Sequence, residues 1–156
     1  MFAQLPLAEQ LLAILALVLI GLSSATIALL PFRRFAGLLG RSQGPVGYLP
    51  LLDARETRRA VLVRRAVGRG ATVAPFRSNC LPQAMAAAML SRLLRFPLAT
   101  HLGVEIKPGG LAAHAWSTAG SVMVSGGFGF GRYTVVSCFV TGVPWDRARR
   151  AETGPI

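Results

Sequence analysis

The 156-residue chain is poor in cysteine, in lysine and in acidic side chains. Its two cysteines, Cys80 and Cys138, are too few for a disulfide scaffold, and no CxxC or Cys/His cluster has the spacing of zinc ligands. The chain also lacks a glycine-rich phosphate loop and the aromatic-plus-basic signature of RNA-binding domains. We therefore expect no metal and no cofactor, and two free thiols fit a cytoplasmic, reducing environment.

Positive charge dominates what is present. Basic side chains outnumber acidic ones by 17 to 6, which gives a formal net charge of +11, and every basic residue except Lys107 is arginine. Such a charge suits a polyanionic partner, for example an anionic membrane surface or an acidic peptide. No nucleic-acid-binding motif accompanies it, so nucleic acid is not an expected partner, and a solvated basic face is the simpler interpretation.

The longest apolar run covers residues 11–30, about the length that spans a bilayer. Glu9 stands where a secretory signal carries positive charge, so a signal peptide is not expected. If the run spans a membrane, Arg33 and Arg34 would keep the following chain on the cytoplasmic side. We favour the other interpretation, a helix that is buried against the domain or lies on the inner membrane surface.

The order of elements predicts an α+β domain, with N-terminal helices packed on an antiparallel sheet. Helices are expected over residues 32–39, 53–67 and 81–95, with Gly68 and Gly70 ending the second, and a linker over 40–50. Strands are expected over residues 101–106, 112–118, 121–125 and 133–140. The predicted organisation is a hydrophobic helical segment with linker (1–45), a core (46–145) and a polar tail (146–156).

Cys80 precedes a helix that Ser78 or Asn79 can cap, with Pro82 in its first turn. The free N–H groups and dipole of a helix start favour a thiolate, and the same N–H groups can donate to an oxyanion during acyl transfer. Asn79 and Gln83 are candidates to assist there. A cysteine in this position is also compatible with a small buried side chain, so the assignment depends on a second residue.

His114 is that second residue. It lies within a predicted strand, two positions before Trp116, so both side chains point to one face and the indole can pack beside the imidazole on the substrate side. A helix start packed against this sheet would bring His114 within hydrogen-bond reach of Cys80, as a thiolate–imidazolium pair. His101 is interpreted as structural or exposed, and Cys138 as a core residue.

The chain carries, in this order, Asn79-Cys80-Leu81-x-x-Ala84, Leu102-Gly103-Val104 and Ala113-His114-Ala115-Trp116. An apolar N-terminal segment that ends in Pro31-Phe32-Arg33-Arg34 accompanies them. Together these motifs resemble the lasso-peptide leader peptidases, the stand-alone peptidase halves of the lasso-peptide B proteins, over roughly residues 31–140. The resemblance implies a transglutaminase-like, papain-related cysteine protease core.

It also implies a reaction and a set of partners. Cys80 would attack the bond between the leader and the core of a precursor peptide, and His114 would protonate the leaving amine. A separate leader-recognition protein would present the precursor, and an ATP-dependent cyclase would close the macrolactam. A non-peptidase acyl-transfer enzyme or a membrane-tethered binding module of the same fold is the alternative.

The sequence departs from the family at the third catalytic position. The strand that follows His114 carries no carboxylate, where these peptidases have an aspartate that orients the imidazole. Ser125 is the nearest polar side chain for this role, and a backbone carbonyl is another candidate. Cysteine proteases depend less on the third group than serine proteases do, because the ion pair forms before substrate binds.

Overall fold

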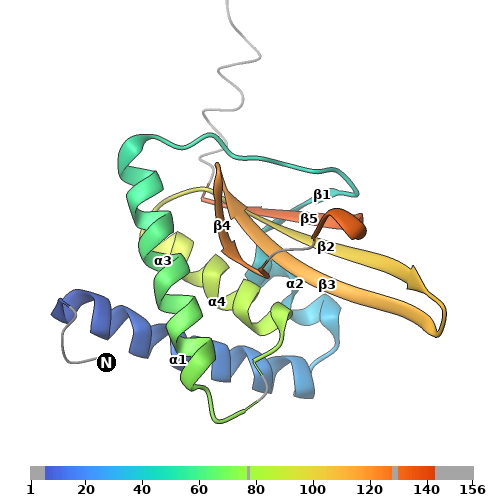
Figure 1. Cartoon of the computed structure of the whole chain (residues 1–156), viewed down its shortest axis with the longest axis horizontal. Helices are drawn as coiled ribbons and strands as arrows, with labels where there is room; N and C mark the ends of the chain where they lie inside the picture. The colour runs from blue at the N-terminus through green and yellow to red at the C-terminus, as the bar shows by residue number, and fades with distance from the viewer. Residues whose placement is uncertain (1–5, 77, 128–129, 143–156) are drawn as a thin grey trace, which may run out of the picture.

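The computed structural model describes residues 6–76, 78–127 and 130–142, and these form an α+β fold (Figure 1). This confirms the predicted fold class. The helices are α1 (Leu7–Leu29), α2 (Phe32–Leu39), α3 (Ala54–Val73) and α4 (Cys80–Leu93), with a short 3-10 turn, η1, at Phe130–Arg132. The strands are β1 (Arg41–Gly44), β2 (Leu98–Lys107), β3 (Gly110–Ala119), β4 (Val122–Ser125) and β5 (Thr134–Thr141).

The five strands form one antiparallel sheet in the order β1-β5-β2-β3-β4. The long β2–β3 hairpin is its centre and extends beyond the helices at one end (Figure 1). The tight turn after Lys107 consists of Pro108 and Gly109, and Gly110 already pairs with Lys107. The predicted tail, residues 146–156, lies outside the described residues.

The helices gather on one side of the sheet, with α4 next to it and α1 farthest away (Figure 1). Helix α4 is buried along most of its length, which fits a sequence with only one charged residue, Arg92. Its alanines Ala86, Ala87 and Ala88 are fully buried and let α1, α3 and the sheet approach closely. The core therefore surrounds α4 and fixes the position of its first residue, Cys80.

Two expectations about local structure were wrong. Gly68 and Gly70 do not end the second helix, which continues to Val73. A Cβ at Gly70 would lie 2.9 Å from the backbone nitrogen of Leu17, so this glycine permits the close crossing of α3 and α1. The second error concerns residues 41–44, which were assigned to a linker but form β1 and pair with β5.

Helix α1 is long and apolar enough to cross a membrane by length and composition. In the structure one of its faces, with Ala13, Ala16 and Ile20, is buried against the other helices. Glu9 adds an ion pair, because its carboxylate accepts a hydrogen bond from Arg69 of α3 at 2.8 Å. These contacts attach α1 to the domain along its length.

Candidate active site

Cys80 lies at a helix start, as predicted; it is the first residue of α4, one position before the expected start at residue 81, and its side chain is partly exposed. Asn79 before it has extended backbone and makes no side-chain capping hydrogen bond in the described structure. Pro82 has no N–H, and the N–H of Gln83 bonds to the Asn79 carbonyl at 3.4 Å. The N–H groups of Cys80 and Leu81 are therefore the ones left at the positive end of the helix dipole.

His114 lies in the middle of β3, opposite Gly103 of β2. Its Nε2 lies 2.8 Å from the carbonyl oxygen of Gly126. Because a carbonyl can only accept, Nε2 carries the hydrogen, and Nδ1 is the ring nitrogen that can take up a proton. The expected packing of Trp116 is confirmed, with ring centroids 5.9 Å apart, and Tyr133 contacts the imidazole at 5.0 Å.

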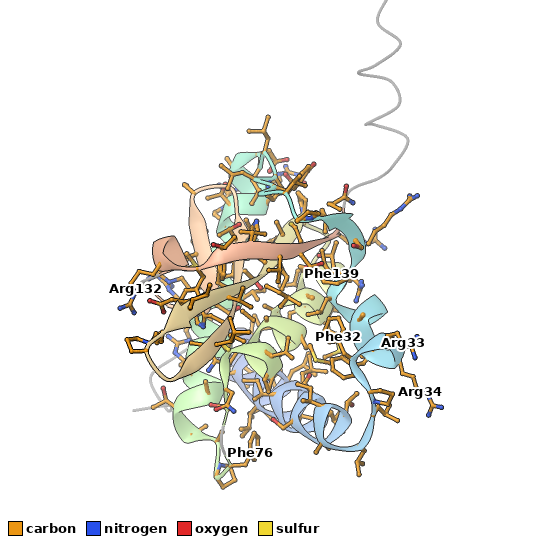
Figure 2. All side chains as sticks on the ribbon, turned by 90° about the vertical axis from the view of Figure 1, so that its right-hand side faces the viewer. Phe32, Arg33, Arg34, Phe76, Arg132 and Phe139 are labelled. Carbon is orange, nitrogen blue, oxygen red and sulfur yellow. The ribbon has the colours of Figure 1, made fainter. Side chains whose placement is uncertain are left out.

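A cavity of about 310 Å³ has both Cys80 and His114 in its wall. The wall is otherwise apolar and comes from α2, α4, β2, β3 and β5, with Phe32, Leu81, Leu102, Gly103, Val104, Ala113, Ala115 and Val136. Phe32 is fixed by edge-on contacts with Phe35 at 5.3 Å and Phe139 at 6.2 Å (Figure 2). The cavity can therefore accept an apolar group beside the thiol.

The imidazole itself projects from the other face of the sheet. His114 and Trp116 share a face because they are two residues apart on β3. Helix α4 packs instead on the alternating residues, such as Leu98 and Ala119. Among the described residues no hydrogen bond joins Cys80 to His114. The expected hydrogen-bond contact is therefore not present in this structure, and strand alternation is the physical reason.

The residues considered as helpers have other contacts. Ser125 is buried, and its hydroxyl makes no hydrogen bond within the described structure, so it does not hold the His114 ring; the Gly126 carbonyl does. Gln83 donates to the Ser78 carbonyl at 2.7 Å and lines a second cavity, of about 340 Å³, with Ser125 and Gly126. Asn79 is exposed at the helix start, and Trp116 is 4% exposed beneath the imidazole.

The rings of His101, His114, Trp116 and Tyr133 form a cluster, which we call the ring cluster. The sequence did not indicate that His101 belongs to it. His101 is buried, stacks on Trp116 at 5.4 Å with 14° between the planes, and its Nε2 accepts from the Tyr48 N–H at 3.3 Å. Burial lowers the pKa of His101 and raises the pKa of its cross-strand neighbour Cys138. Both groups are therefore kept neutral, and Cys138 is a core residue as expected.

A family model described as the transglutaminase-like superfamily matches residues 26–138, which include Cys80, His114 and most of the sheet. No curated protein and no solved structure matches this chain.

Proposed function

Because the chain belongs to the transglutaminase-like superfamily, we propose that it is a cysteine peptidase that removes the leader from a lasso-peptide precursor. Cys80 is the nucleophile and His114 the base. The observation that supports this proposal most is the shared cavity, whose apolar wall includes both Cys80 at the helix start and residue His114 of β3, while the imidazole projects from the other face of the sheet.

The reaction follows from these groups. The Cys80 thiolate attacks the carbonyl carbon of the last leader residue. The resulting oxyanion accepts hydrogen bonds from the N–H groups at the start of α4. The C–N bond then breaks, and the imidazolium of His114 gives its proton to the departing amine of the core peptide. Water, deprotonated by the imidazole, hydrolyses the thioester and releases the leader with a free carboxylate.

For this chemistry the imidazole must turn toward Cys80 from the position that it occupies here. Strand β4 pairs with β3 only as far as Ser125 opposite Ser117, so β3 has no described partner on that side at His114. Because a rotation about the Cα–Cβ bond leaves Cβ on its own face of the sheet, this edge of β3 must itself move to bring the ring to Cys80. In apo enzymes catalytic hydrogen bonds are often formed only once substrate is bound.

The proposal includes three partners. The precursor peptide occupies the cavity, a separate recognition protein binds its leader, and an ATP-dependent cyclase receives the freed core amine. The apolar wall suits an apolar leader side chain next to the cleaved bond, since the lining beside Cys80 consists of leucine, valine, alanine and phenylalanine.

The test is cleavage of a precursor peptide by the purified chain together with its recognition protein, followed by mass spectrometry. We expect Cys80→Ala to abolish cleavage while recognition-protein binding and circular dichroism stay unchanged. Cys138→Ala is the matched control and should still cleave, because Cys138 is buried in the sheet away from the cavity. Cleavage that survives Cys80→Ala would overturn the assignment.

One observation favours the alternative, an acyl-transfer enzyme or binding module of the same fold. The His114 ring is bonded to Gly126 and stacked on the sheet face opposite α4, an arrangement suited to a structural histidine. A binding module predicts that Cys80→Ala leaves biosynthesis of the mature product unchanged. An acyl-transfer enzyme predicts that added amines, rather than water, capture the acyl group.

A further inference from the structure

Helix α1 presents one continuous apolar face to solvent. Its six large side chains are each 51–80% exposed: Leu7, Leu11, Ile14, Val18, Leu22 and Leu29. The other exposed positions of the helix are the alanines Ala8, Ala25 and Ala28. We call these nine residues the α1 outer face. It contains no polar side chain, whereas soluble monomers rarely expose apolar patches of this extent.

The outer face is a consequence of helical geometry. Its large residues recur at spacings of three, four or seven, which places them along one stripe, and the buried residues Ala13, Ala16 and Ile20 occupy the opposite side. From Leu7 to Leu29 the stripe is about 33 Å long at 1.5 Å per residue. The helix is therefore apolar on both sides, but only one side has a partner in the described structure.

Aromatic and basic side chains flank this face. Phe76 follows α3 and packs against α1, since a Cβ at Gly21 would lie 3.3 Å from its ring, and Phe76 is itself 37% exposed. Beyond the end of α1, Arg33 and Arg34 are exposed and extend away from the body of the molecule (Figure 2). The one acidic residue of the helix, Glu9, points to the inner side, where it pairs with Arg69.

We propose that the α1 outer face docks the protein on an anionic lipid surface, with α1 lying in the plane of that surface. An exposed apolar stripe can enter the acyl boundary of a bilayer, while the neighbouring Arg33 and Arg34 of α2 contact the headgroups. A second copy of the chain is a poorer fit, because it would bring together two copies of the Arg33–Arg34 pair and two chains of net charge +11.

The cavity begins close in sequence to the end of the outer face. Phe32 lies three residues after the last residue of the outer face and forms part of the cavity wall beside Cys80. One residue of the cavity wall therefore lies close in sequence to the lipid-bound helix.

The experiment is flotation of the purified full chain with vesicles of phosphatidylcholine containing 30% phosphatidylglycerol, and with vesicles of phosphatidylcholine alone. We expect flotation with the anionic vesicles and about tenfold weaker partitioning for the double variant Leu11→Gln, Leu22→Gln. The double variant Arg33→Gln, Arg34→Gln should lose the preference for anionic vesicles while still binding weakly. The matched control is Ile106→Gln, Leu111→Gln, at exposed apolar positions on β2 and β3, and it should float like the wild type.

Size-exclusion chromatography with light scattering, without lipid, decides between the occupants. A monomer that floats supports the proposal. A dimer that Leu11→Gln, Leu22→Gln converts to a monomer would show that a second copy covers the face, and would overturn it. A soluble monomer that does not float with anionic vesicles would overturn it as well. Neither result depends on peptidase activity, so the proposed reaction is tested separately.

Discussion

The Nε2 atom of His114 donates a hydrogen bond to the carbonyl oxygen of Gly126 across 2.8 Å. Gly126 directly follows β4, the region where the resemblance to lasso-peptide leader peptidases leads one to expect a carboxylate. A backbone carbonyl fixes the same tautomer that a carboxylate would, but it carries no full negative charge. Orientation of the imidazole here comes from the backbone together with the rings of Trp116 and Tyr133.

Replacing Gly126 tests that orientation. Its φ is +93°, and a Cβ would lie 2.5 Å from the Cβ of Trp116 and 2.6 Å from the Ala115 carbonyl oxygen, so the backbone must shift. We expect Gly126→Ala to lower kcat/KM by about tenfold or more, because the carbonyl moves away from His114. Gly127→Ala is the control, since Gly127 also has positive φ, +65°, but has space for a Cβ. Equal losses of activity in the two variants would contradict the role of the Gly126 carbonyl in orienting His114.

The two cysteines should differ in their reaction with iodoacetamide. Cys80 is partly exposed at a helix start, whereas Cys138 is fully buried in the sheet. We expect the native protein to take up one carbamidomethyl group, at Cys80, and the protein unfolded in guanidinium chloride to take up two. Peptide mapping by mass spectrometry measures this. Labelling of Cys138 in the native protein would show that the sheet opens more readily than its packing indicates.

The buried ring cluster predicts a pH dependence of stability. Burial lowers the pKa of His101 below its ordinary value of 6.5, so below that pH the unfolded state binds the proton more readily than the folded state. The free energy of unfolding should therefore decrease as the pH falls below about 6.5. Urea titrations at pH 8, 7, 6 and 5 would measure it, with His101→Gln as the comparison. If the variant loses as much stability on acidification as the wild type, His101 is not the cause.

Gly103 should not tolerate a side chain, because the rings around it leave no space for a Cβ. A Cβ there would lie 2.8 Å from the Trp116 ring and 2.8 Å from the Cβ of Tyr133. We expect Gly103→Ala to destabilise the protein by about 1–3 kcal/mol through overpacking, measured by urea unfolding. Gly109→Ala, in the β2–β3 turn with nothing near its Cβ, should change stability far less. A similar loss of stability in both variants would mean that the rings around Gly103 can move to accommodate a Cβ at little cost.

Much of the fold could be predicted from the sequence, because the signals are local. Pro82 in the first turn indicates the start of α4, and the Pro108-Gly109-Gly110 turn divides the central hairpin. Strand β1 could not be found in this way, since Arg41-Ser42-Gln43-Gly44 has no apolar alternation and exists through its pairing with β5. Helix α3 continues past Gly68 and Gly70 because tertiary contact with α1 outweighs the weak helix propensity of glycine.

Part of the site could likewise be predicted from local sequence signals, and part could not. Cys80, His114 and the contact with Trp116 follow from residue type and strand period. The role of the Gly126 carbonyl could not be predicted, because every residue has a backbone oxygen and the sequence does not indicate which one faces the imidazole. His101 of β2 and Tyr133, which directly precedes β5, come from other parts of the sequence and meet Trp116 only through the pairing of the strands. The face on which His114 projects likewise depends on how β3 is placed over α4.

The central claim, that Cys80 carries the acyl group, is tested most directly by trapping the intermediate. The purified chain, its recognition protein and a precursor peptide would be mixed, quenched in acid and analysed by intact-mass and peptide mass spectrometry. We predict a leader thioester on Cys80, its absence in Cys80→Ala, and formation slowed by about a hundredfold or more in His114→Ala. Cleaved leader without any thioester on the wild-type chain, together with normal cleavage by Cys80→Ala, would contradict the account.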